Sequence, residues 1–91
     1  MSEAETLYAE ATLGKDAEEF LLSDLGRYLV ARAEEEEQEA LNALSKVSSF
    51  RRRRILELQA QVWRARQFKS WLGEMIVTGQ QALQQLESAA E

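Results

Sequence analysis

The chain contains no cysteine, no histidine and no proline, and only four of its 91 residues are glycine. The absence of cysteine and histidine excludes disulfide bonds, thiolate nucleophiles, imidazole bases and the most common zinc ligands. Because proline is absent and glycine is scarce, little in the chain interrupts helix propagation. We therefore expect long helices, no enzymatic activity, and no metal or other cofactor.

Long apolar runs are missing as well. The longest ones fall far short of the ~20 residues that span a bilayer. Residues 1–10 are acidic and polar, unlike a secretory or mitochondrial signal. These features predict a protein without membrane contact, located in the cytoplasm.

Charge is distributed unevenly along the chain, whose net charge is −5. Residues 1–45 carry twelve acidic side chains against three basic ones, whereas residues 46–71 carry eight basic side chains against one acidic. Such separation indicates mutual neutralisation, within the fold or between copies. A nucleic-acid surface more often has a basic domain without flanking acidic runs, so nucleic acid is not an expected partner.

The residues that are abundant, chiefly Ala, Leu, Glu, Gln and Arg, are strong helix formers. In residues 1–22, apolar residues at helical spacing predict one or two short helices. Gly14 stands where a C-cap glycine belongs, and Asp16 is a good N-cap for a following turn. We therefore expect a joint near Gly14.

Two long helices should follow, over residues 24–46 and 50–90. The first has an inner stripe with steps of three and four, and the second has a seam of ten positions of which eight are apolar. The stripe comprises Leu25, Leu29, Ala33, Glu36, Ala40, Leu44 and Val47; the seam comprises Ile55, Leu58, Val62, Ala65, Lys69, Leu72, Ile76, Gly79, Leu83 and Leu86. Ser48 and Ser49 make a short joint, and either can cap the next helix. The prediction is a single all-α domain over residues 1–91, built on an antiparallel helical hairpin.

A second apolar stripe lies beside and behind this seam on residues 50–90. It contains Leu56, Trp63, Phe68, Trp71, Met75 and Val77. A helix that is apolar on two sides needs two neighbours. Aromatic residues at helical spacing could stack on bases, but they are more often core or interface residues. We expect Trp63, Phe68, Trp71, Met75 and Val77 to form a packing face in a homo-oligomeric bundle.

Four consecutive arginines, Arg51 to Arg54, follow Phe50 at the start of the second long helix. The position is electrostatically unfavourable, because a helix N-terminus already carries about half a positive charge. Arg53 and Glu57 have the i, i+4 spacing of an ion pair. The run is either a solvated corner neutralised by acidic neighbours or a binding site for a phosphate-bearing ligand or an acidic partner.

The run Glu34 to Glu37 suggests a metal site at first sight. Four consecutive helical residues spread around most of the helix, however, so they cannot converge on one ion. In a hairpin they would face residues 60–63, near Arg64 and Arg66. An ion-pair patch within the hairpin is the favoured interpretation.

Gly26 and Gly73 fall inside predicted helices, where glycine costs about 1 kcal/mol relative to alanine. Close approach of a neighbouring helix is the simplest explanation. A local bend or a ligand contact is the alternative.

The residues from Phe20 to Leu29, then Arg32 to Glu34, Leu58, Gln59, Trp63 to Ala65, Phe68, Trp71, Leu72 and Gly79, form a further pattern. Over about residues 13–87 the chain resembles small helical proteins encoded by tailed bacteriophages and prophages, often near capsid and portal genes. The resemblance implies a phage source and no mechanism. With that source, we expect a non-enzymatic helical protein that acts by binding phage or host proteins, in the host cytoplasm or in the virion. The alternative is an oligomeric sponge that sequesters a nucleotide second messenger of host defence, using Arg51 to Arg54 and an aromatic residue such as Phe50.

Overall fold

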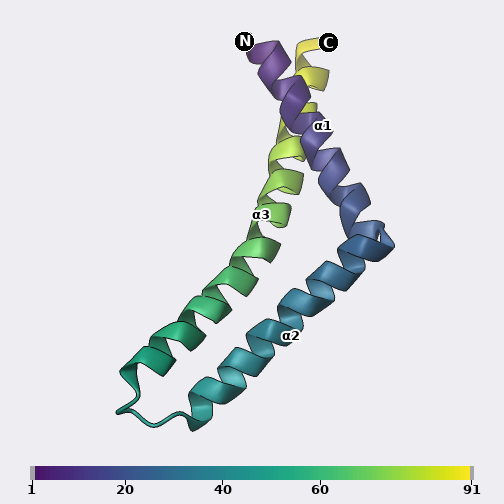
Figure 1. Cartoon of the computed structure of the whole chain (residues 1–91). Helices are drawn as coiled ribbons and strands as arrows, with labels where there is room; N and C mark the ends of the chain where they lie inside the picture. Colours follow the sequence, from purple (N-terminus) through teal and green to yellow (C-terminus); the bar gives the residue numbers. More distant parts are fainter. Residues whose placement is uncertain (1, 91) are drawn as a thin grey trace. The chain divides into compact units, whose positions relative to one another are not determined.

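The computed structural model describes residues 2–90, and helices make up nearly all of this part of the chain (Figure 1). α1 spans Glu3–Leu22, α2 spans Asp24–Lys46 and α3 spans Arg52–Ala90. The described residues include no strand, so the predicted all-α class is confirmed. None of these helices is long and apolar enough to cross a membrane.

α1 is one uninterrupted helix, so the predicted joint near Gly14 is wrong. The Ser2 hydroxyl caps its start by accepting a hydrogen bond from the Glu5 N–H at 3.2 Å. Gly14 has no positive φ and is buried inside the helix. A Cβ atom at Gly14 would lie 2.7 Å from the Gly79 Cα atom. Gly14 is therefore needed for close approach to α3 and does not terminate a helix.

Ser23 separates α1 from α2. Its backbone is extended, and its N–H donates to the carbonyls of Glu19 and Phe20 at the end of α1. Its hydroxyl accepts the Gly26 N–H at 3.0 Å, which caps the start of α2. At Gly26 an added Cβ would overlap the Phe20 carbonyl, so close approach does explain this glycine.

The chain divides into two compact units. The first, here the glycine-crossing unit, comprises the described residues up to 27 and those from 71 onward. Small buried residues mark the contact of α1 with α3 in this unit: Gly14, Ala17, Gly79 and Ala82. Ala82 is buried where Leu83 was predicted, and Leu83 is half exposed. A crossing at which glycine backbones touch leaves room only for small side chains.

The second unit, here the leucine-core unit, comprises residues 28–70. Its core contains Ala40, Leu58 and Val62, with Leu41, Ala43 and Leu44 packed against it. Contacts move toward the start of α3 as they move toward the end of α2. Ala40 packs with Leu58, whereas the Glu36 carbonyl, one turn earlier in α2, accepts a hydrogen bond from Gln61 at 3.0 Å.

The turn between α2 and α3 differs from the prediction, because α3 begins at Arg52 and not at Phe50. Ser48 does not cap α3. Its hydroxyl accepts the Phe50 N–H at 3.3 Å, and its carbonyl accepts the Arg51 N–H at 3.0 Å. The Arg51 carbonyl accepts the Ile55 N–H, which puts an arginine at the N-cap position.

Candidate functional site

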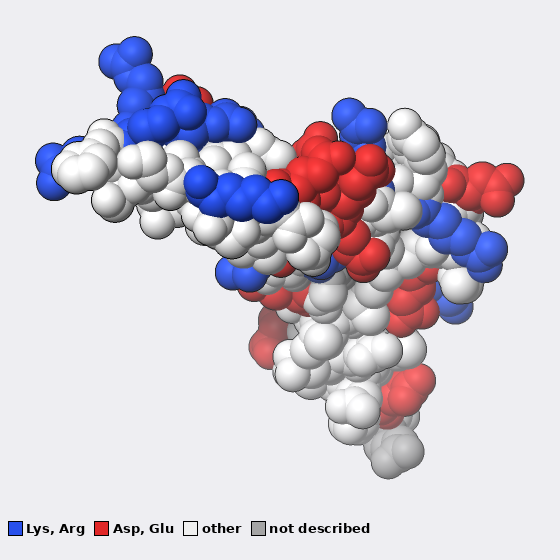
Figure 2. Space-filling model, turned by 90° about the horizontal axis from the view of Figure 1, so that it is seen from below, with Lys and Arg blue, Asp and Glu red and all other residues white. Residues whose placement is uncertain are grey.

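The turn that precedes α3 forms a basic tip, defined here as Phe50 together with Arg51 to Arg54. Phe50 is 93% exposed, and all four arginines are exposed. With Glu57 these residues line a shallow hollow. Figure 2 shows several Lys and Arg side chains crowded together on one part of the surface. Every candidate ligand-binding residue from the sequence therefore lies in one exposed cluster.

The basic tip carries little compensating negative charge of its own. The first turn of α3 has no acidic residue, so the guanidinium groups add to the positive end of the helix dipole. Arg54 lies 3.5 Å from Glu57, with both side chains about half exposed. The predicted pair of Arg53 with Glu57 is thus replaced by an i, i+3 pair, which contributes only a few tenths of a kcal/mol.

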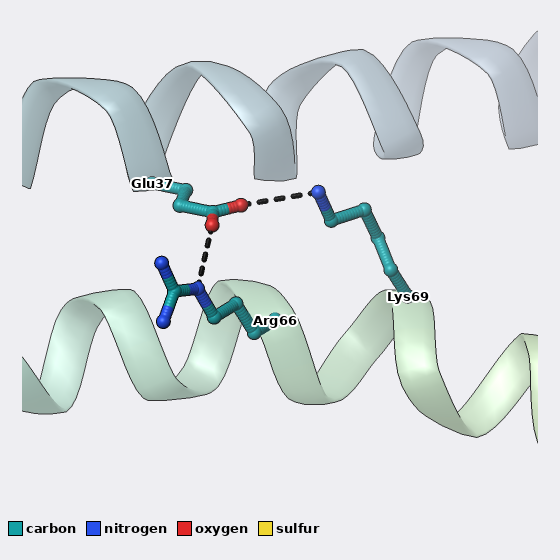
Figure 3. Close-up of polar contacts among 3 residues, drawn as sticks. All are labelled: Glu37, Arg66 and Lys69. Carbon is teal, nitrogen blue, oxygen red and sulfur yellow. Dashed lines mark hydrogen bonds and ion pairs between the residues drawn. The ribbon is translucent and has the colours of Figure 1, made fainter.

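Glu37 is the centre of an ion-pair cluster between α2 and α3 (Figure 3). Its carboxylate accepts hydrogen bonds from Arg66 Nε at 2.7 Å and from Lys69 Nζ at 3.0 Å. The hydrogen bond from Arg66, followed by that from Lys69, holds the pKa of Glu37 below its ordinary value of 4.5. The predicted ion-pair patch is confirmed at Arg66, with Lys69 as the second cation in place of Arg64.

The predicted packing face is largely open to solvent. Trp63 is 62% exposed and Trp71 is 55% exposed, while Met75 and Val77 are also exposed and Phe68 is half-buried. Within the glycine-crossing unit, Trp71 and Met75 line a shallow groove with Leu13 of α1. Gly73 has no atom within 4 Å of an added Cβ, so close helix approach does not explain that glycine.

A second groove in the glycine-crossing unit was not predicted. It has a volume of about 430 Å³. Its lining from α1 includes Tyr8, Ala11, Thr12 and Lys15, and its lining from α3 includes Ile76, Leu83 and Leu86. The spacing of the α1 residues, in steps of three, one and three, is the signal that could have identified this face. The predicted break at Gly14 concealed this face, because a break there would place Lys15 on a different helix from Tyr8, Ala11 and Thr12.

No protein-family model, curated protein or solved structure matches the chain. Two features stand out: a basic tip with an exposed phenylalanine, and a long helix with exposed tryptophans.

Proposed function

We propose that this protein is a non-enzymatic helical interaction module that works by binding proteins, with a second copy of itself as a partner. The observation that carries the proposal is the exposure of large apolar side chains along α3, above all Trp63 and Trp71. Tryptophan and methionine are enriched at protein interfaces, where burial of their area stabilises association.

The proposed architecture is an antiparallel helical hairpin assembled into an oligomeric bundle. Contacts in the leucine-core unit support the hairpin, because the Glu37 carboxylate and the Glu36 carbonyl both bind α3 side chains at residues 61–69. Assembly would give the outward tryptophans the second neighbour that a two-sided apolar helix needs. In this arrangement Trp63, Phe68, Trp71, Met75 and Val77 meet another copy.

The resemblance to small helical phage proteins supplies the biological setting of the proposal. In that setting the protein is a virion-associated or host-directed accessory protein that acts on a phage or host protein in the host cytoplasm. Its support is the residue pattern that carries the resemblance, which includes Trp63 and Trp71, two residues that an interaction protein would use for contact.

Sedimentation equilibrium tests the self-association. We expect a mass above 10.4 kDa at micromolar concentration, and a loss of association of at least about ten-fold when Trp71→Gln and Met75→Gln are combined, as for interface hot spots. The matched control combines Gln81→Ala and Gln84→Ala, two exposed polar positions on the same helix, and should associate like the parent chain. A mass of 10.4 kDa throughout the accessible range would refute the proposal.

A second candidate function rests on the hollow at the basic tip. Phe50 beside four arginines combines a stacking surface with charge-assisted donors, the groups that bind a nucleotide's base and phosphates. In this alternative the oligomer sequesters a nucleotide second messenger of host defence. Native mass spectrometry with cyclic dinucleotides tests it: retained nucleotide that is lost on combining Arg52→Gln and Arg53→Gln supports the sponge, and no retained nucleotide excludes it.

A further inference from the structure

The basic tip has positive charge that its own chain leaves unpaired. Arg54 pairs with Glu57, but Arg51, Arg52 and Arg53 form no ion pair with an acid among residues 2–90. One stretch of chain, residues 50–57, supplies the whole lining of the hollow. A specific small ligand usually has most of its surface buried, and this single exposed turn does not bury one on its own. A broad acidic surface suits the basic tip better.

The outward face of α2 has the complementary composition. Tyr28 is 62% exposed, and Glu35 and Glu39 are exposed. Their spacings of seven and four residues put all three on one side of the helix, away from the buried Ala33 and Ala40. Arg32 and Lys46 lie on the same side, but Arg32 is paired with Glu36 at 3.6 Å. Neither carboxylate has an ion-pair partner among the described residues. We call Tyr28, Glu35 and Glu39 the acidic stripe.

We propose that the basic tip of one copy docks on the acidic stripe of a second copy. Arg52 and Arg53 pair with Glu35 and Glu39, and Phe50 packs against Tyr28. Charge complementarity is the argument: unpaired arginines and an exposed aromatic meet two unpaired glutamates and an exposed aromatic. The helix segment that carries these glutamates, residues 28–46, holds five glutamates against Arg32 and Lys46. The inference rests on the proposed self-association and specifies one of its contacts.

The contact joins two different surfaces, so each copy offers one of each. Two copies can exchange both contacts in a two-fold symmetric dimer; otherwise such contacts generate a closed ring or an open chain of copies. Both surfaces lie within residues 28–70, in the leucine-core unit. Charged pairs at an interface also steer association and make it dependent on salt.

Reciprocal charge reversal tests the contact. One variant combines Arg52→Glu and Arg53→Glu, and the other combines Glu35→Arg and Glu39→Arg. Each alone sets like charges against each other, so we expect at least a ten-fold loss of self-association at low salt, as for close charge pairs at an interface. An equimolar mixture of the two should recover association, because a basic surface again meets an acidic one. Sedimentation velocity of the separate and mixed variants, with helicity checked by circular dichroism, measures this.

The control reverses two exposed acids outside the proposed contact, Glu19→Arg with Glu87→Arg, which changes net charge as much as reversal of the acidic stripe. It should associate like the parent chain. If the parent oligomer persists unchanged in both reversed variants, the contact is refuted while the proposed self-association stands. If the variants weaken association and the mixture does not recover it, the pairing is likewise refuted. A parent chain of 10.4 kDa at every concentration overturns both proposals together.

Nucleotide supplies a further arm of the experiment. If the basic tip is occupied by a second copy, ATP at about millimolar concentration should compete and reduce association at low salt, because its phosphates bind the same guanidinium groups. Nucleotide that binds Arg52 and Arg53 without changing the oligomer overturns the contact in favour of the sponge.

Discussion

The two units of this protein pack helices in different ways, although both use α3. In the glycine-crossing unit, α1 and α3 approach so closely that a Cβ on Gly79 would lie 2.7 Å from the Gly14 Cα and 3.0 Å from the Glu10 carbonyl oxygen. In the leucine-core unit, α2 and α3 are separated by whole side chains, with Leu58 and Val62 buried. Backbone contact depends on the absence of a side chain, whereas a side-chain core depends on its volume. A substitution that adds volume should therefore destabilise the glycine-crossing unit, and one that removes volume should destabilise the leucine-core unit.

The largest effect is expected for Leu58→Ala, which removes most of the volume of a side chain that is only 2% exposed. Truncation of a buried leucine should lower the free energy of unfolding by about 2–5 kcal/mol. Gln59→Ala, at an exposed neighbouring position, should change it by less than about 0.5 kcal/mol. Urea denaturation measures both, and equal effects would mean that the leucine-core unit does not rest on Leu58.

The glycine crossing gives a prediction of opposite sense. Gly79→Ala adds a methyl group against backbone atoms of α1, so we expect a loss of about 1–3 kcal/mol despite the better helix propensity of alanine. Gly73→Ala lies in the same helix and meets no atom within 4 Å, so propensity alone should stabilise it by about 0.5–1 kcal/mol. Thermal denaturation measures both variants. If both change stability in the same direction, Gly79 is not in backbone contact with α1 and the distinction between the two units fails.

The ion-pair cluster makes the leucine-core unit sensitive to acid. The pKa of Glu37 in the folded chain is lowered by the hydrogen bonds from Arg66 and Lys69, so its contribution to stability is present above the ordinary value of 4.5. That contribution is lost as the pH falls through the folded pKa. We expect Glu37→Gln to be less stable than the parent chain at neutral pH, with the difference shrinking below pH 4.5.

Denaturant unfolding of both chains from neutral pH to about pH 3 checks this expectation. Glu34→Gln is the control, because Glu34 is exposed on the same helix. A difference between the Glu37 variant and the parent chain that is independent of pH would show that the two hydrogen bonds do not stabilise the ionised carboxylate in the folded state.

The smallest expected effect on stability is at the basic tip. Combining Arg52→Gln and Arg53→Gln removes two charges that oppose the α3 dipole, so the free energy of unfolding should hold or rise by a few tenths of a kcal/mol. Binding of an acidic partner or a phosphate ligand should be abolished. If the double variant remains fully active in binding and in a phage-infection or defence-inhibition assay, the tip is a solvated corner. A clear loss of stability would instead show that these arginines help hold the turn.

Helical content, the bounds of α2 and the buried positions Leu58, Val62 and Ala65 in α3 could be predicted from the residues alone. These features depend on local helix propensity and on the spacing of apolar residues, and both are visible in a single continuous segment of the sequence. The arginine cluster was equally visible, because its members are consecutive. The exposure of these arginines could also be predicted, because charged side chains without partners remain in contact with water.

The role of Gly14 could not be read in this way. Glycine ends helices and also permits close helix contact, and the choice depends on what lies opposite. Gly79 lies opposite, 65 positions along the chain, and it turns a predicted break into the centre of a helix crossing. Lys69 replaced Arg64 as a partner of Glu37 for the same reason: long side chains reach in directions set by the neighbouring helix. Contacts between distant residues depend on packing, which the order of residues along one helix does not specify.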